Sequence, residues 1–195
     1  MILIKNTNSK INNVIHIADI HIRLTKRHDE YLSVFDKFYS ILDKLKLSTN
    51  AVLVIAGDIF HNKSDFSPEC VEIGSNFLKN CADRIPTILI AGNHDATLAN
   101  KSRLDCLTPI VNALQHSNLH YLKTTDIYRY ENILFNNFSV FDDPDTYIKY
   151  ENIPSKYKLE TDHHIALFHG PVNNAITDIG YTVSNRAITN ELFDG

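Results

Sequence analysis

Residues 87–95 read Thr-Ile-Leu-Ile-Ala-Gly-Asn-His-Asp, an apolar run that ends in a glycine followed by side chains able to bind metal. The run has the length of a buried strand, and the glycine permits a sharp turn and close approach of the backbone. Asn93 offers a neutral carbonyl oxygen that suits a hard divalent ion. His94, one residue further on, is free to act as a proton donor. An isolated Asn-His pair is typical of a surface turn, but its place directly after a buried strand favours a functional site.

Three other apolar runs end in the same way, and each is followed by a residue of a metal-binding type. The runs are Val14–Ala18 before Asp19 and His21, Ala51–Ala56 before Asp58, and Ile165–Phe168 before His169. Side chains two residues apart on an extended chain point to the same side, so we expect Asp19 and His21 to bind one ion together. Each motif alone is weak, because turn aspartates and structural histidines are common. The series of four strand ends predicts a two-metal hydrolytic centre at one sheet edge.

The spacing of apolar residues predicts alternating strands and helices in the first hundred residues, which favours a parallel sheet with its functional loops at the carboxyl ends of the strands. The pattern then changes to short strands. We expect His16 to point inward from its strand and residues 1–13 to form an edge strand or a hairpin arm. The expected helices cover residues 29–46, 68–83 and 103–115, the later strands lie near 119–122, 127–130, 133–141 and 164–168, and residues 142–162 form a long connection.

Composition predicts one globular domain and limits its partners. The chain has 195 residues, of which 44% are hydrophobic, and a net charge of -4. Such a charge gives no general attraction to nucleic acid or to an anionic membrane, so a polyanionic substrate has to be attracted locally, by bound cations. Three cysteines without a CxxC spacing argue against a disulfide framework and against a zinc ribbon. Without a signal-peptide core or a membrane-length apolar stretch, we expect a soluble, intracellular protein with no membrane partner.

The series resembles the calcineurin-like metallophosphoesterases, whose motifs run D-x-H, G-D, G-N-H-D/E, H and G-H-x-H, and four of these five are present in order. The resemblance implies an α/β fold, a four-layer α-β-β-α sandwich of two mixed sheets, over residues 1–195. It also implies two divalent metal ions, manganese first and iron, zinc or magnesium as alternatives. Asp19 and His21 are implied to bind the first metal ion, and Asn93 and His169 the second. Asp58 is implied to bridge the two ions. His94 is implied to donate a proton and to be oriented by Asp95.

A narrower resemblance is to the double-strand-break repair nucleases of the SbcD type, carried by Gly57-Asp58-Ile59-Phe60-His61, by residues 27–31 and by residues 168–172. It implies a DNA exonuclease or endonuclease in which His61 positions the DNA, a coiled-coil ATPase of the SbcC type as partner, and a homodimer. A phosphoprotein phosphatase and a small phosphodiester hydrolase of the same superfamily stay open. So does a catalytically weak module that binds DNA or a partner protein.

The last family motif, G-H-x-H, does not occur in the sequence. We therefore expect a phosphoesterase domain that ends at Gly195 without its C-terminal part, so that the second sheet is incomplete and the activity uncertain. Residues 190–195 look like the segment just before the strand that carries this motif. The histidines that could substitute lie elsewhere in the pattern, and we do not expect them to reach the site: His116, His120, His163 and His164.

Overall fold

Strand β3 (Ala51–Ala56) is buried along its whole length. Leu53 and Ile55 pack into a core formed with helices, whereas Val52 and Val54 pack into a second core formed with another sheet. Successive residues of a strand face opposite sides, so an unbroken apolar run fits a strand that is covered on both faces. This one strand therefore marks the middle of the fold.

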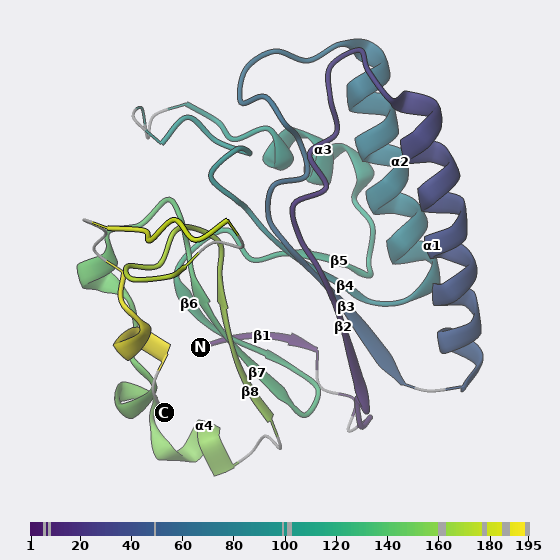
Figure 1. Cartoon of the computed structure of the whole chain (residues 1–195). Coiled ribbons are helices and arrows are strands. Elements are labelled where there is room, and N and C mark those ends of the chain that lie inside the picture. The colour runs from purple at the N-terminus through teal and green to yellow at the C-terminus, as the bar shows by residue number, and fades with distance from the viewer. Residues whose placement is uncertain are drawn as a thin grey trace.

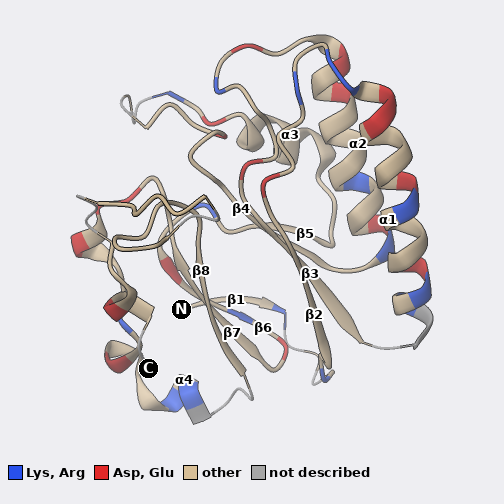
Figure 2. Ribbon diagram, in the orientation of Figure 1, with Lys and Arg blue, Asp and Glu red and all other residues tan. Residues whose placement is uncertain are grey.

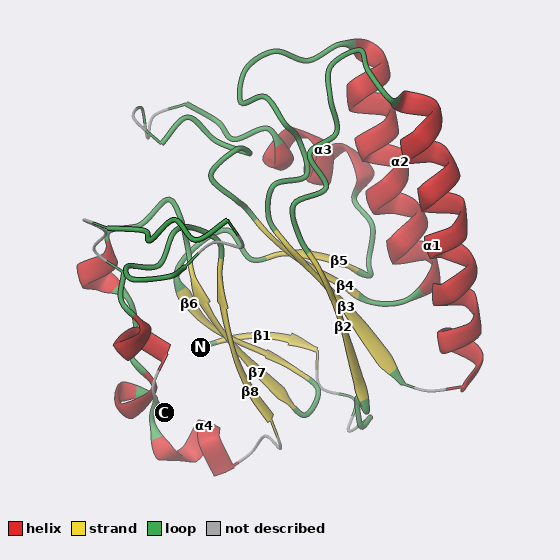
Figure 3. Cartoon of the chain, viewed as in Figure 1, coloured by secondary structure: helices red, strands yellow, loops and turns green. Residues whose placement is uncertain are grey.

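The sheet that contains β3 has the order β2-β3-β4-β5, and all of its strands are parallel. Its other strands are β2 (Asn13–Ile17), β4 (Thr87–Ile90) and β5 (Leu119–Tyr121). The helices that cover its outer face are α1 (His28–Ser48), α2 (Pro68–Arg84) and α3 (Leu107–Leu114) (Figure 3). Helix α2 begins as expected at Pro68, where Oγ of Ser67 accepts a hydrogen bond from the backbone N–H of Cys70. The predicted alternation of strands and helices is confirmed.

The second sheet has the order β1-β6-β7-β8 and is mixed, since β6 and β7 are antiparallel and the other pairs are parallel. Its strands are β1 (Ile2–Lys5), β6 (Asp126–Tyr130), β7 (Ile133–Phe138) and β8 (His163–Phe168). Short helices lie beside its outer face, namely η1 (Pro144–Thr146), η2 (Tyr150–Asn152), α4 (Ser155–Leu159) and η3 (Asn190–Phe193). A small core of Ile127, Leu134 and Ile153 joins them to the sheet.

Figure 1 shows the computed structural model, in which the two sheets face one another between the two groups of helices. The predicted four-layer α-β-β-α sandwich is confirmed, except that the first sheet is wholly parallel instead of mixed. The structure describes residues 1–195 apart from 6, 8, 49, 99, 101–102, 160–162, 177–178, 185–187 and 194–195. Parts of the expected N-terminal arm, of the 142–162 connection and of the C-terminal segment therefore lie outside the described residues. No helix in the described ranges is long and apolar enough to cross a membrane.

Three local expectations need correction. Helix α3 begins four residues later than predicted, because the Asp105 carboxylate accepts hydrogen bonds from the backbone N–H groups of Leu107 and Thr108. Strand β7 ends at Phe138, since Ser139 donates its hydroxyl to the carbonyl of Lys123 and begins a turn. His16 lies on the face of β2 that turns towards the second sheet, like its paired residue Val54, but it is exposed, since β2 is an edge strand.

Candidate metal centre

A cavity of about 510 Å³ opens where the chain leaves β2, β3, β4 and β8. Figure 2 shows acidic residues on the loops that follow β2 and β3. Six of the eight predicted site residues line this cavity: Asp19, His21, Asp58, Asn93, His94 and His169. The other two are not among the lining residues: His61 lies beside the rings of His21 and His94, and Asp95 is buried. The strand ends thus gather their polar side chains at one place, as expected, but not at one sheet edge, because β8, which leads to His169, belongs to the second sheet.

The sequence pattern had suggested an extended backbone at the ends of β2 and β3. The structure instead shows turns there. Asp19, His21 and Asp58 have φ values of 57°, 51° and 55°. Aspartate, asparagine and histidine are among the non-glycine residues that adopt this left-handed region most readily. The two segments run side by side, with the backbone N–H of His21 donating to the carbonyl of Asp58 at 2.9 Å. Asp19 and His21 therefore meet because of paired turns, and not because of strand alternation.

Asp19, Asp58 and His169 form the first group of possible ligands, and one ligand atom from each lies within 4.8 Å of the others. Nε2 of His169 is 3.2 Å from Oδ2 of Asp58, and Nε2 of His21 is 3.5 Å from the same oxygen. Nδ1 of His169 is 2.6 Å from the carbonyl oxygen of Ala56, which fixes the ring so that Nε2 faces the carboxylates. With Asn93 on the same wall, these donors fit divalent cations that accept oxygen and imidazole ligands.

The charges of this group are coupled. Burial alone would raise the pKa of the Asp58 carboxyl, but the hydrogen bonds from His169 and from the backbone N–H of His94 outweigh it and lower that pKa. Burial would likewise lower the pKa of His169, yet the Asp58 carboxylate raises it overall. The protein thus keeps Asp58 ionised at the centre of the cavity. A cation binding there competes with the proton on His169, because an imidazole ligand has to be neutral.

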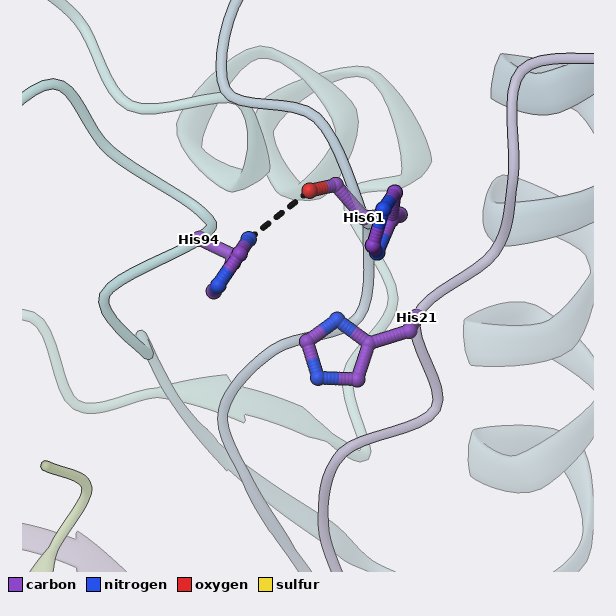
Figure 4. A group of neighbouring side chains, drawn as sticks. All are labelled: His21, His61 and His94. Atoms are coloured by element: carbon purple, nitrogen blue, oxygen red, sulfur yellow. Dashed lines mark hydrogen bonds between the residues drawn. The ribbon is translucent and has the colours of Figure 1, made fainter.

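His21, His61 and His94 form a second group, whose ligand atoms also lie within 4.8 Å of one another. Figure 4 shows the three rings and the hydrogen bond between Nδ1 of His94 and the carbonyl oxygen of His61, at 2.8 Å. A carbonyl only accepts, so Nδ1 of His94 carries a proton and Nε2 is left for chemistry. Burial lowers the pKa of His61, and the nearby Arg23 guanidinium adds to this effect.

Asp95 contacts the backbone instead of orienting His94 as predicted. Its side chain is buried, and its oxygens accept hydrogen bonds from the N–H groups of Gly92, Asp58, Ile59 and Phe60 at 2.8–3.3 Å. Burial raises the pKa of Asp95 to about 6, against the lowering effect of these N–H groups. The orienting contact on His94 comes from the carbonyl of His61. Asp95 therefore holds together the turns that follow β3 and β4.

Two glycines let those turns approach each other. A Cβ atom on Gly92 would lie 2.1 Å from Oδ1 of Asp58, and a Cβ atom on Gly57 would lie 2.6 Å from the backbone nitrogen of Gly92. Other supports were also missed from the sequence. The hydroxyl of Tyr31 donates to the carbonyl of His21 at 2.6 Å, and the carbonyl of Ala56 holds His169. Only the glycines of the Gly-Asp and Gly-Asn motifs could have signalled this packing, since a backbone carbonyl has no sequence signature.

The four histidines considered as substitutes lie away from the cavity in the part of the chain that the structure describes. His116 pairs with Asp83, and the His120 ring packs against Tyr130. His164 contacts the hydroxyl of Tyr150, while His163 begins β8 at the end opposite to His169. Their placement agrees with the expectation that they do not replace a missing metal ligand.

Comparison with known proteins agrees with this geometry. A family model described as Calcineurin-like phosphoesterase matches residues 13–194. The chain is 43% identical over 195 residues to "Uncharacterized protein R555" of Acanthamoeba polyphaga mimivirus, covering 97% of this chain and 14% of that protein. It is 25% identical over 192 residues to the DNA double-strand break repair protein Mre11 of Archaeoglobus fulgidus, covering 91% of this chain and 42% of that protein. The chain thus spans less than half the length of both relatives.

Proposed function

Because the chain belongs to the calcineurin-like phosphoesterase family, we propose that it is a metal-dependent nuclease that hydrolyses phosphodiester bonds in DNA. The observation that carries this proposal is the cavity in which two carboxylates, an asparagine and three of the predicted site histidines meet from four strand ends. Their donor types suit divalent cations, and the cavity is open to a substrate.

The proposed ligands divide between two ions. Asp19 and His21 would hold one, and Asn93 and His169 would hold the other. The carboxylate of Asp58, whose Oδ2 lies near Nε2 of both His21 and His169, would be shared between them. When bound, divalent ions at such a centre lower the pKa of water and neutralise charge on phosphoryl oxygens. We propose manganese as the resident metal, with iron, zinc and magnesium as the alternatives.

His94 is the proposed general acid. The carbonyl of His61 fixes its Nδ1–H, so that Nε2 can carry and deliver the proton that the leaving oxygen needs. The backbone N–H of His94 donates to Oδ1 of Asp58 at 2.8 Å. This hydrogen bond fixes the position of His94, the proposed acid, relative to Asp58, the proposed bridging ligand. Proton donation by a positioned side chain typically contributes about 10²–10⁴-fold to a rate.

DNA is the proposed substrate on two grounds. His61 lies next to His94, with 5.8 Å between the ring centroids, where an imidazole can contact a phosphate beside the one under attack. The similarity to an archaeal double-strand break repair protein supports the same substrate class. The net charge of -4 confines DNA attraction to the metal-binding edge. A coiled-coil ATPase partner and a homodimer stay predictions.

The test is cleavage of end-labelled single-stranded and hairpin DNA with manganese, with and without a chelator. We expect cleavage that the chelator abolishes and that His94→Ala slows by about 10²–10⁴-fold. His163→Ala removes an exposed histidine at the far end of β8 and should cleave like the wild type. Equal cleavage by wild type and His94→Ala would contradict the assignment of the acid. Hydrolysis of a phosphoprotein or a small phosphodiester, with DNA left intact, would favour another phosphoesterase.

A further inference from the structure

The second histidine group contains more nitrogen donors than the proposed reaction uses. The ring centroids of His21, His61 and His94 lie 4.9–5.8 Å apart, and each ring brings one nitrogen to within 4.8 Å of the other two. These residues come from the turns after β2, β3 and β4. No carboxylate belongs to the group, which distinguishes it from the neighbouring group of Asp19, Asp58 and His169.

Two of these nitrogens have no hydrogen-bond partner. Nδ1 of His21 and Nδ1 of His61 are both buried and both unpaired, among the side chains that the structure describes. A buried polar atom without a partner destabilises a fold, so two of them in one group of rings need an explanation. The other nitrogen of His21, Nε2, lies towards Asp19 and Asp58 at 3.4 and 3.5 Å. Figure 4 shows that a ring nitrogen of His21 points towards the other two rings.

We propose that His21, His61 and His94 bind a third cation, of the borderline transition metals that imidazole prefers, with zinc as the probe. Three histidines with one open position form a known type of zinc coordination, whereas manganese and magnesium favour oxygen ligands. His21 contributes Nδ1 and His94 contributes Nε2, because Nδ1 of His94 already bonds to the carbonyl of His61. Nitrogens bound to one zinc ion lie roughly 3.4 Å apart, so a modest rotation of the side chains closes the site.

The proton balance of this step is simple. An ion on Nδ1 of His21 displaces the proton of that nitrogen when Nε2 also binds a metal, and the ring then bridges two cations as an imidazolate. The released proton goes to solvent.

Such an ion would regulate the proposed nuclease. It occupies Nε2 of His94, the nitrogen that delivers the proton, and it immobilises His61. Zinc added to the manganese-loaded protein should then slow DNA cleavage. This consequence rests on the proposed function, whereas zinc binding itself does not.

The experiment counts zinc by mass spectrometry after the full chain is equilibrated with zinc alone and dialysed. The wild type should retain one more zinc ion per chain than His61→Gln and His94→Gln, both of which keep all five proposed ligands of the main centre. His163→Gln, an exposed histidine, is the matched control and should retain the wild-type number. Asp58→Asn weakens the main centre but leaves the three imidazoles, and it should keep one zinc ion. The visible absorption of added cobalt gives a second measurement, since a four-coordinate site absorbs far more strongly than a six-coordinate one.

The outcomes separate this inference from the proposed function. Equal zinc content in wild type, His61→Gln and His94→Gln, all folded by circular dichroism, overturns the third site even if DNA is cleaved. Loss of one zinc ion in both variants supports the third site even if no DNA is cleaved. Loss of a direct ligand should weaken zinc binding by more than the roughly 10–100-fold that loss of an outer-shell partner produces. If His61→Gln and His94→Gln both unfold, the test depends on the zinc content of Asp58→Asn. A zinc content of zero in that variant overturns the third site.

Discussion

The backbone N–H of Asp58 donates a 2.8 Å hydrogen bond to Oδ2 of Asp95, a carboxylate that does not itself line the metal-binding cavity. The same oxygen accepts the N–H of Gly92 at 2.9 Å. Asp95 thus joins the turn after β3 to the turn after β4. The position of the bridging carboxylate therefore depends on a buried residue behind it.

Asp95→Asn should destabilise the protein by about 2–4 kcal/mol, because an amide nitrogen replaces one of the two accepting oxygens and leaves N–H groups unpaired. Urea denaturation followed by circular dichroism measures this change. Asp83→Asn, on an exposed aspartate that pairs with Lys79, is the control and should change stability by about 1 kcal/mol or less. Equal effects of the two substitutions would show that Asp95 has no special role in joining the turns.

Gly57→Ala should weaken metal binding and destabilise the fold by more than Gly180→Ala does. Both glycines have a left-handed backbone, with φ of +84° and +81°, so both substitutions introduce the same backbone strain of about 1–2 kcal/mol. Only at Gly57 would the new Cβ meet other atoms, 2.6 Å from the nitrogen of Gly92, whereas nothing lies within 4 Å at Gly180. Calorimetric titration with manganese and thermal unfolding measure the difference. Matching losses in the two variants would mean that the close approach of the turns is unimportant.

The stability of the protein in acid should depend on Asp105. Burial alone would raise its pKa, but the Lys123 ammonium and the hydrogen bonds from Thr108 outweigh burial and lower that pKa. An acid with a lowered folded-state pKa adds stability above its unfolded value of about 3.9, and this stability is lost as the pH falls through the folded-state pKa. The gap in unfolding free energy between wild type and Asp105→Asn should thus be constant above about pH 5 and shrink below about pH 4.

Asp65→Asn, at an exposed position, is the control for this pH series and should follow the wild type throughout. Urea denaturation at several pH values gives the free energies. A gap that widens as the pH falls would contradict the direction assigned to the pKa of Asp105.

Manganese at about 100 times its dissociation constant should stabilise the folded chain by about 2.7 kcal/mol, because it binds the assembled cavity and not the unfolded chain. For a chain of this size, that corresponds to a rise in Tm of about 5–10 °C. Asp58→Asn should lose most of the rise, since Asp58 is the proposed bridge, and His163→Ala should keep it. Differential scanning calorimetry with metal and with chelator measures both. An undiminished rise in Asp58→Asn would place the metal elsewhere.

The sequence predicted the parts of the fold that depend on periodicity and burial. Ala51–Ala56 is apolar throughout and is buried throughout, and the cavity gathers the polar residues that follow each run. What it did not predict depends on contacts between segments. The left-handed turns at Asp19 and His21 follow from hydrogen bonds to the neighbouring segment, which no local pattern reveals.

The role of Asp95 illustrates the same limit. In the sequence it follows His94 directly, and the family resemblance implied that it orients His94. In the structure its partners are backbone N–H groups, three of them on the turn after β3. Helix α3 is similar, because an acidic side chain capping its first turn fixes its start, while the apolar spacing alone would extend it.

Strand β1 pairs in parallel with β6, so Ile2 lies beside Tyr128. During synthesis the first strand must wait for more than a hundred residues before its partner exists. At ribosomal rates of roughly 5–20 residues per second, this delay is on the order of 6–24 s. Throughout that interval the apolar segment Ile2–Lys5 has no partner strand and is exposed to chaperones.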